Sequence, residues 1–273
     1  MKLRVTHHTH YAYTPAVETA QHLACLKPVD STCQALLSHS LRIEPAPSQQ
    51  IEQRDVFKNE QLFFSLQSPH ETLDVISQST IETFVPPTYP STIAWETVRE
   101  QFRYKAGSDY EPANEFVFPS PYVKRHEDFA SYARTSFPKG MSLLQAAQDL
   151  MHRIYADFTY ESHSTEINTP ALEALATRKG VCQDFAHIMI ACLRSMGMPA
   201  RYVSGYLLTH PAPGKERLIG SDASHAWVSV YLPDLPGASE GSGWWDLDPT
   251  NNKDGWGSPG DDYIRLAFGR DFS

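Results

Sequence analysis

The sequence predicts an α+β protein in which a β-rich first part precedes helices and then a second, antiparallel sheet. Three observations support this fold class. Segments rich in β-forming residues recur roughly ten residues apart through the first third of the chain. Apolar residues at helical spacing then replace them in the middle of the chain. Alternating apolar and polar residues return after the helices, in the last third.

The β-rich region begins at the N-terminus. In Leu3–Tyr13 the apolar and aromatic residues fall mainly at odd positions with polar residues between them, as in a strand with one buried face. Pro, Ser, Asn and Gln separate the further strands that we expect at 40–44, 61–66 and 73–84. The pattern predicts a sandwich-like antiparallel domain over residues 1–117.

The middle of the chain is expected to join two domains. Residues 91–135 hold aromatic and charged residues without a clean period, and F-P-S-P-Y at 118–122 is typical of a connecting segment. We therefore expect a connection at 118–140 and a second domain over residues 141–273.

The second domain is expected to hold two helices before its sheet. Residues 141–155 carry apolar residues at helical spacing, and Ser142 stands where a helix cap is needed. Another helix begins near Cys182, carries its apolar residues on one stripe and ends at Gly197 and Pro199. Alternating strands are then expected at 201–208, 225–232 and 244–248.

Composition narrows the class of protein. The chain has 273 residues, 41% of them hydrophobic, and a net charge of -9. A chain of this length buries a core without a disulfide or a metal. Its acidity, without a Lys/Arg block, predicts no nucleic-acid partner and no anionic membrane surface. No apolar run approaches the ~18 residues of a membrane span, and the first ten residues lack a signal-peptide segment, which indicates a cytoplasmic protein.

One of the four cysteines stands apart from the others. Cys25, Cys33 and Cys192 are interpreted as reduced structural thiols, since no C-x-x-C pair occurs. Cys182 lies in the first turn of its predicted helix, on the apolar stripe. The unsatisfied N–H groups and the positive end of the helix dipole there favour the nucleophilic thiolate and could stabilise an oxyanion.

A base and a carboxylate are expected near this thiol. His225 starts a strongly alternating strand, and Asp246 and Asp248 lie at the end of the next strand. Two neighbouring antiparallel strands can bring a histidine and an aspartate side by side. Packed against the helix of Cys182, they would form a line of thiol, imidazole and carboxylate. The pattern alone does not choose between the two aspartates, which point to the same face of a regular strand.

Four motifs together resemble the transglutaminase-like superfamily, and more narrowly its bacterial branch of proposed cysteine proteases. They are G-V-C-Q-D-F-A-H, A-R-Y-V-S-G-Y-L, S-H-A-W-V-S-V-Y-L-P and W-W-D-L-D-P-T-N-N, in this order. The resemblance implies a papain-like core, with a helix-borne cysteine packed on an antiparallel sheet. It implies Cys182 as the nucleophile, His225 as the base and Asp248, the aspartate of D-P-T, as the third member. The N-terminal part resembles the β-rich domain of that branch, although Lys58 stands where the branch tends to have glycine.

The resemblance also implies how the oxyanion is held and what the protein acts on. Relatives use the N–H group of the nucleophile together with a second donor, for which Tyr160 and Gln183 are candidates here, and Tyr206 is expected to reach the cleft. The substrate would be a peptide or protein, and the chemistry needs no cofactor and no metal.

The implied activity is acyl transfer from an amide or isopeptide carbonyl through a thioester, with water or an amine as the acceptor. The sequence leaves peptidase or amidase and transglutaminase open. The alternative is a catalytically silent module that binds a peptide or protein on the same scaffold. His8 and His10 would share a strand face that could bind a metal, but solvated histidines are expected, because no third ligand stands at a recognised spacing.

Overall fold

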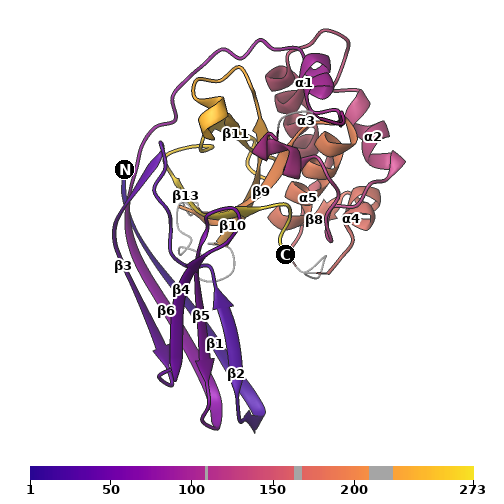
Figure 1. Cartoon of the computed structure of the whole chain (residues 1–273). Coiled ribbons are helices and arrows are strands. Elements are labelled where there is room, and N and C mark those ends of the chain that lie inside the picture. The colour runs from indigo at the N-terminus through magenta and orange to yellow at the C-terminus, as the bar shows by residue number, and fades with distance from the viewer. Residues whose placement is uncertain (108–109, 163–167, 209–223) are drawn as a thin grey trace, which may run out of the picture. The chain divides into compact units, whose positions relative to one another are not determined.

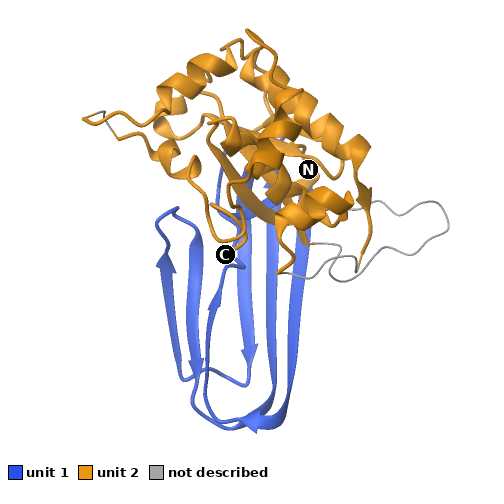
Figure 2. Cartoon of the chain, turned by 90° about the vertical axis from the view of Figure 1, so that its right-hand side faces the viewer, with its two compact units in different colours: residues 1–84, 264–267 blue, residues 85–263, 268–273 orange. Residues whose placement is uncertain are grey.

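The computed structural model describes residues 1–107, 110–162, 168–208 and 224–273. They form two compact units, coloured separately in Figure 2. Unit 1 comprises residues 1–84 and 264–267, and unit 2 comprises residues 85–263 and 268–273. Within the described ranges, no helix is long and apolar enough to cross a membrane.

Unit 1 consists mainly of two antiparallel sheets of three strands each (Figure 1). One sheet has the order β1-β6-β3 and the other the order β2-β5-β4. The strands are β1 (Lys2–Val17), β2 (Ala20–Ala24), β3 (Gln34–Glu44), β4 (Gln49–Arg54), β5 (Glu60–Leu66) and β6 (His70–Thr83). The predicted β-rich, sandwich-like N-terminal region is thereby confirmed.

The core of unit 1 lies between these sheets. Its buried residues come from strands of both sheets, namely Ile43, Phe64, Leu66, Leu73 and Val75. Along the first strand, exposed residues alternate with half-buried ones from Lys2 to His10, as expected for a strand with one solvated face.

The turn between β4 and β5 departs from the glycine that the resemblance led us to expect. Lys58 adopts the left-handed conformation, with φ of 67°, which glycine reaches without strain and lysine does not. Asp55 stabilises the turn, because its Oδ1 accepts from the backbone N–H groups of Phe57 at 2.9 Å and Asn59 at 2.8 Å. The backbone conformation is thus the one that favours glycine, with lysine in its place.

Unit 2 gathers its helices beside a five-stranded sheet (Figure 1). They are α1 (Trp95–Gln101), the 3-10 helix η1 (Pro112–Phe116), α2 (Glu127–Arg134), α3 (Leu143–Asp157), α4 (Ala171–Thr177), α5 (Cys182–Ser195) and the 3-10 helix η3 (Ala238–Glu240). Ser142 caps α3 by accepting from the N–H of Gln145 at 3.3 Å. Helix α2 lies within residues 118–140, where the sequence predicts a connection.

The five-stranded sheet has the strand order β12-β11-β10-β9-β13, and it belongs to unit 2 except for residues 264–267 of β13. Its strands are β9 (Ala200–Leu207), β10 (Ser224–Tyr231), β11 (Trp244–Asp248), β12 (Lys253–Trp256) and β13 (Tyr263–Gly269). A short parallel pair, β7 (Thr159–Tyr160) and β8 (Lys179–Gly180), precedes α4 and α5 respectively. Helix α5 packs against β9 and β10 on one side and against α2, α3 and α4 on others. It is therefore the buried central helix of unit 2.

Arg194 fixes the C-terminal end of this central helix. Its guanidinium donates to the carbonyl oxygens of Phe116 at 2.8 Å and Ala200 at 2.8 Å, and to the hydroxyl of Ser120 at 3.1 Å. Burial lowers the pKa of Arg194 to about 9, with the charge of Arg270 adding to this effect. The carbonyl acceptors satisfy the donors of a guanidinium that is only 3% exposed.

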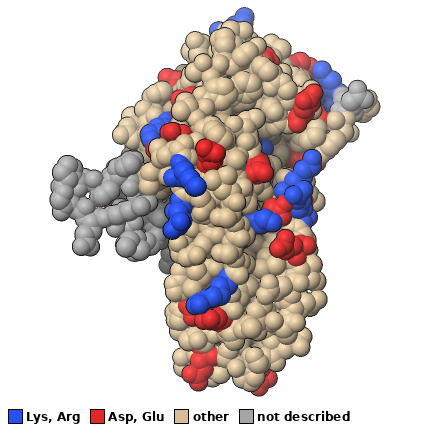
Figure 3. All heavy atoms as spheres, turned by 90° about the vertical axis from the view of Figure 1, so that its left-hand side faces the viewer, with Lys and Arg blue, Asp and Glu red and all other residues tan. Residues whose placement is uncertain are grey.

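Charges of both signs are interspersed over the described part of the face drawn in Figure 3. Red and blue side chains alternate there and neither sign forms a broad patch. The net charge of -9 is therefore not concentrated on that face.

Candidate active site

A tight strand-to-helix junction sets the position of Cys182. Strand β8 ends at Gly180, Val181 is extended, and Cys182 is the first residue of α5. The carboxylate of Asp184 folds back and accepts from the N–H of Val181 at 2.9 Å. A Cβ on Gly180 would lie 2.8 Å from both Cβ and Oδ2 of Asp184. Glycine is required here, and the junction holds the thiol at the helix N-terminus.

His225 stands at the beginning of β10 and is 9% exposed. Gly205 on β9 lies directly across from it. Two aromatic rings flank the imidazole, with Trp227 stacked at 6.2 Å and Tyr263 tilted at 6.0 Å between ring centroids. The ring therefore lies in a largely dry environment.

Asp248 ends β11 immediately before Pro249 and is fully buried. Its Oδ1 accepts from the backbone N–H groups of Thr250 at 2.8 Å and Asn251 at 3.3 Å. Its Oδ2 accepts from His225 Nε2 at 2.7 Å and from Asn251 Nδ2 at 2.8 Å. Burial raises the pKa of Asp248, but the hydrogen bonds from His225, Tyr263 and Asn251 outweigh it and lower the pKa below its ordinary value. The carboxylate is ionised.

Tyr263 supplies another donor from a distant strand. Its hydroxyl lies 2.6 Å from Asp248 Oδ2, although β9 and β10 separate β13 from β11 in the sheet order. The ring also packs edge-on against Trp227, with centroids 5.5 Å apart. Burial, reinforced by the charge of Asp248, raises the pKa of Tyr263, so the phenol keeps its proton and donates.

The imidazole of His225 interacts with both an acid and a thiol. Burial lowers its pKa, but hydrogen bonds with Asp248 and Cys182, and their charges, outweigh burial and raise the pKa to about 10. Since Nε2 donates to Asp248, Nδ1 is the ring nitrogen left for Cys182. This arrangement favours the protonated, positively charged form of the imidazole.

The two aspartates of β11 have different partners. Asp246 accepts from Trp227 Nε1 at 2.9 Å and from the Ser229 hydroxyl at 2.5 Å. Asp248, two residues later, accepts from His225. The strand register explains the difference, because Asp246 lies opposite Ser229, which is four residues beyond His225 on β10.

The three weaker sequence candidates, Tyr160, Gln183 and Tyr206, lie on three different elements, β7, α5 and β9. Tyr160 on β7 pairs with Gly180, and its exposed ring lies edge-on to Phe185, 6.4 Å between centroids. Gln183 follows Cys182 in the first turn of α5 and is half-buried. Tyr206 is buried on β9 opposite Ser224, and burial raises its pKa.

Two residues in contact with Asp248 were not among the sequence candidates. Asn251 belongs to the same D-P-T-N-N segment. The turn residues of that segment could have indicated that the Asn251 amide folds back on the aspartate. Tyr263 offered no such signal, because strand order alone brings it to Asp248. Outside this site, one further group of described side chains, formed by His8, His10 and Asp74 in unit 1, has the composition of a metal site.

The comparisons with known proteins agree with this fold. The chain matches the family described as the bacterial transglutaminase-like N-terminal region over residues 3–82, and the transglutaminase-like superfamily over residues 130–249. An uncharacterized protein of Mycobacterium tuberculosis is 40% identical over 277 residues, which cover 100% of this chain and 84% of that protein.

Two further comparisons concern proteins with named activities. A protein-glutamine gamma-glutamyltransferase of Pseudomonas aeruginosa is 32% identical over 111 residues, 38% of this chain and 16% of that protein. The crystal structure of a proposed cysteine protease from Cytophaga hutchinsonii has a TM-score of 0.72 at 22% identity, and the match covers 99% of this chain and 82% of that one.

A helix-borne cysteine packed on an antiparallel sheet, after a β-rich region, defines a transglutaminase-like protein. The chain belongs to the transglutaminase-like superfamily and carries the N-terminal region of its bacterial members.

Proposed function

We propose that the chain catalyses acyl transfer from amide or isopeptide carbonyls through a thioester on Cys182. The observation that carries the proposal is the geometry around His225, whose Nε2 donates to the buried carboxylate of Asp248 at 2.7 Å. Hydrogen bonds with Asp248 and Cys182 outweigh burial and raise the pKa of the imidazole. An imidazolium beside a thiolate is the resting state that a cysteine nucleophile needs.

In the first half-reaction, Cys182 Sγ attacks the carbonyl carbon and the carbonyl oxygen becomes an oxyanion. N–H groups at the start of α5 lie where they could stabilise that oxyanion, and Gln183 or Tyr160 would add a further donor. The C–N bond then breaks. The departing ammonia or amine takes its proton from Nδ1 of His225, which leaves a thioester and a neutral imidazole.

In the second half-reaction, His225 accepts a proton from water or from an amine as that molecule attacks the thioester. The C–S bond breaks and the Cys182 thiolate is restored. Asp248 stabilises the imidazolium and fixes the tautomer throughout, since its Oδ2 accepts from Nε2. Water as the acceptor makes the protein a peptidase or amidase, and an amine makes it a transglutaminase.

We further propose a peptide or protein substrate and work in a reducing compartment. None of the four cysteines forms a disulfide, and reduced thiols suit the cytoplasm.

The test detects the thioester intermediate and does not require that the substrate be known. The chain is incubated with a peptide library and hydroxylamine, which would convert a thioester to a peptide hydroxamate that mass spectrometry detects. Released ammonia and new peptide N-termini then distinguish the bonds that break. We expect hydroxamate from the wild type, none from Cys182→Ala, and a wild-type yield from the matched control Cys25→Ser.

Two results would contradict the proposal. Hydroxamate formed equally by Cys182→Ala would assign the chemistry to another residue. Failure of iodoacetamide to label Cys182 faster than Cys25, with no hydroxamate from the wild type, would favour the silent binding module.

A further inference from the structure

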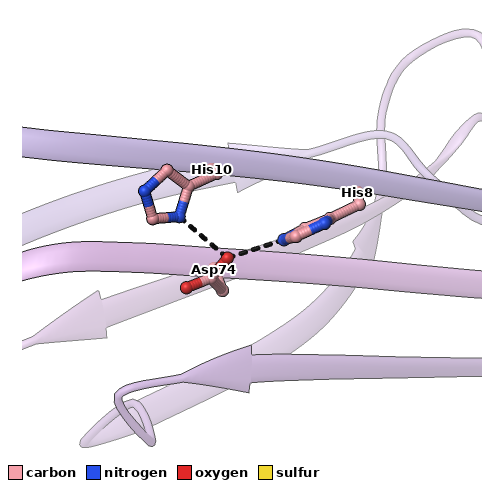
Figure 4. A group of neighbouring side chains, drawn as sticks. All are labelled: His8, His10 and Asp74. Atoms are coloured by element: carbon pink, nitrogen blue, oxygen red, sulfur yellow. Dashed lines mark hydrogen bonds and ion pairs between the residues drawn. The ribbon is translucent and has the colours of Figure 1, made fainter. Parts of the chain in front are cut away.

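The outward face of the sheet β1-β6-β3 carries a cluster of two histidines and an aspartate (Figure 4). His8 and His10 are two residues apart on β1, so they share one face of the strand. Asp74 on β6 lies directly opposite His10. Asp74 Oδ1 lies 2.6 Å from His8 Nε2 and 2.9 Å from His10 Nδ1. Figure 4 shows both rings turned toward this single carboxylate oxygen.

The backbone holds these three side chains in fixed positions. Strands β1 and β6 pair without interruption from Lys2 opposite Glu82 to Ala12 opposite Thr72, and the cluster lies within that stretch. The aspartate is 66 residues from one histidine and 64 from the other, which is why spacing along the sequence offered no third ligand. The strand register supplies it.

We propose that His8, His10 and Asp74 bind one divalent first-row transition metal, with zinc as the representative ion. One nitrogen or oxygen atom of each residue lies within 4.8 Å of the others. Metal bonds of about 2.0–2.2 Å to imidazole nitrogen and carboxylate oxygen hold such atoms at similar separations. The ion would take the place of the protons that now join the rings to the carboxylate.

The donor set determines the class of metal. Two imidazole nitrogens favour zinc, copper, nickel or iron over magnesium and calcium, which prefer oxygen ligands. Three protein ligands leave a further coordination position for water or a ligand atom. The side chains of both histidines are 52% accessible and that of the aspartate is 28% accessible, so an ion reaches the site directly from solvent.

The charges around the cluster suit a cation. Asp74 contributes a carboxylate, one oxygen of which faces both imidazole rings. Glu44 on β3 lies directly across from Asp74 on the other side and adds a second carboxylate to this face. Arg42, the nearby cation on β3, is paired with Glu44 at 3.3 Å. The positive charge of Arg42 therefore pairs with Glu44, the carboxylate on the far side of Asp74 from the histidines.

The test measures binding to the full chain after dialysis against a chelator. Cys182→Ser serves as the background, so that the thiol of the candidate active site does not contribute. Cobalt(II), followed by its visible absorption, and zinc, followed by calorimetry, are the probes. We expect one equivalent of either metal to bind. Asp74→Asn, His8→Gln or His10→Gln, each added to the background, should weaken binding at least about 10- to 100-fold, because losing a ligand costs no less than losing a group that orients a ligand.

His152→Gln is the matched control, since it removes an exposed histidine from α3 without touching the sheet. It should leave the affinity and the stoichiometry unchanged. Metal should also raise the melting temperature of the background but not that of Asp74→Asn, because binding to the native state stabilises it. The proposal is overturned if the background binds no stoichiometric metal, or if the three ligand variants bind as tightly as His152→Gln.

Discussion

Asp248→Asn is expected to lower reactivity strongly while leaving the fold in place. Oδ1 of Asp248 accepts from the backbone N–H groups of Thr250 and Asn251, so the amide oxygen of the new side chain must take that side. The amide NH2 then faces His225 Nε2, which lies 2.7 Å from Oδ2 in the wild type. Because NH2 cannot accept, Nε2 must become the acceptor and the ring proton moves to Nδ1. That tautomer cannot take a proton from Cys182.

The size of the effect follows from the pKa of His225. Each pKa unit corresponds to about 1.4 kcal/mol, so the rise from an ordinary value near 6.5 to about 10 corresponds to roughly 5 kcal/mol. The hydrogen bond and charge of Asp248 supply part of this rise, so their loss lowers the fraction of protonated imidazole. The wrong tautomer alone costs about 10⁴-fold in the well-studied serine protease triad. We therefore expect turnover to fall roughly 10²–10⁴-fold.

The assay compares this variant with Asp246→Asn. Iodoacetamide labelling of Cys182 at neutral pH reports the thiolate, hydroxamate formation reports turnover, and thermal melting reports the fold. Asp246 accepts from Trp227 and Ser229, and a serine hydroxyl can accept from an amide NH2, so its asparagine variant should retain most of both activities. If Asp246→Asn proves the more damaging to labelling and turnover at equal stability, Asp246 is the orienting residue and our reasoning is wrong.

Three further outcomes are expected. Tyr263→Phe removes one donor from the buried carboxylate of Asp248, which keeps its other donors. The loss should cost about 1–3 kcal/mol of stability and slow the labelling of Cys182 far less than Asp248→Asn does. An unchanged melting temperature would contradict the hydrogen bond. Because the pKa of His225 is raised to about 10, its charge persists below that pH. NMR should then show the His225 ring still protonated from about pH 7 to 9, and titration of the ring near its ordinary pKa of about 6.5 would contradict its contacts with Asp248 and Cys182. Gly180→Ala places a Cβ 2.8 Å from Asp184. The variant should lose about 1–3 kcal/mol of stability and label more slowly at Cys182. A melting temperature and labelling rate equal to those of the wild type would mean that the junction adapts freely.

Strong periodicity made the main elements of the fold readable from the sequence. The alternating strand at the N-terminus, the helix capped by Ser142 and the helix that begins at Cys182 all correspond to elements of the structure. Strand β4 (Gln49–Arg54) escaped notice because every residue in it is exposed. An edge strand with two solvated faces has no alternating pattern.

Only those residues of the candidate site that lie in recognisable motifs could be predicted from the sequence. Cys182, His225 and Asp248 each lie in a recognisable segment, and the resemblance distinguished Asp248 from Asp246. No local pattern could reveal that the hydroxyl of Tyr263 reaches the same carboxylate, since that contact depends on how the sheet is ordered. The same limit applies to Asp74, which strand register brings to the histidines of β1.

The hydrogen bond from Tyr263 to Asp248 has a consequence for protein synthesis. Tyr263 is the first residue of β13, the last of the strands that the structure describes. While the ribosome has yet to release that strand, the nascent chain holds its cysteine, histidine and aspartate without the tyrosine that helps to lock the carboxylate. At about 5–20 residues per second, this interval lasts on the order of a second. The order of translation thus makes the hydroxyl of Tyr263 the last of these donors to reach the carboxylate of Asp248.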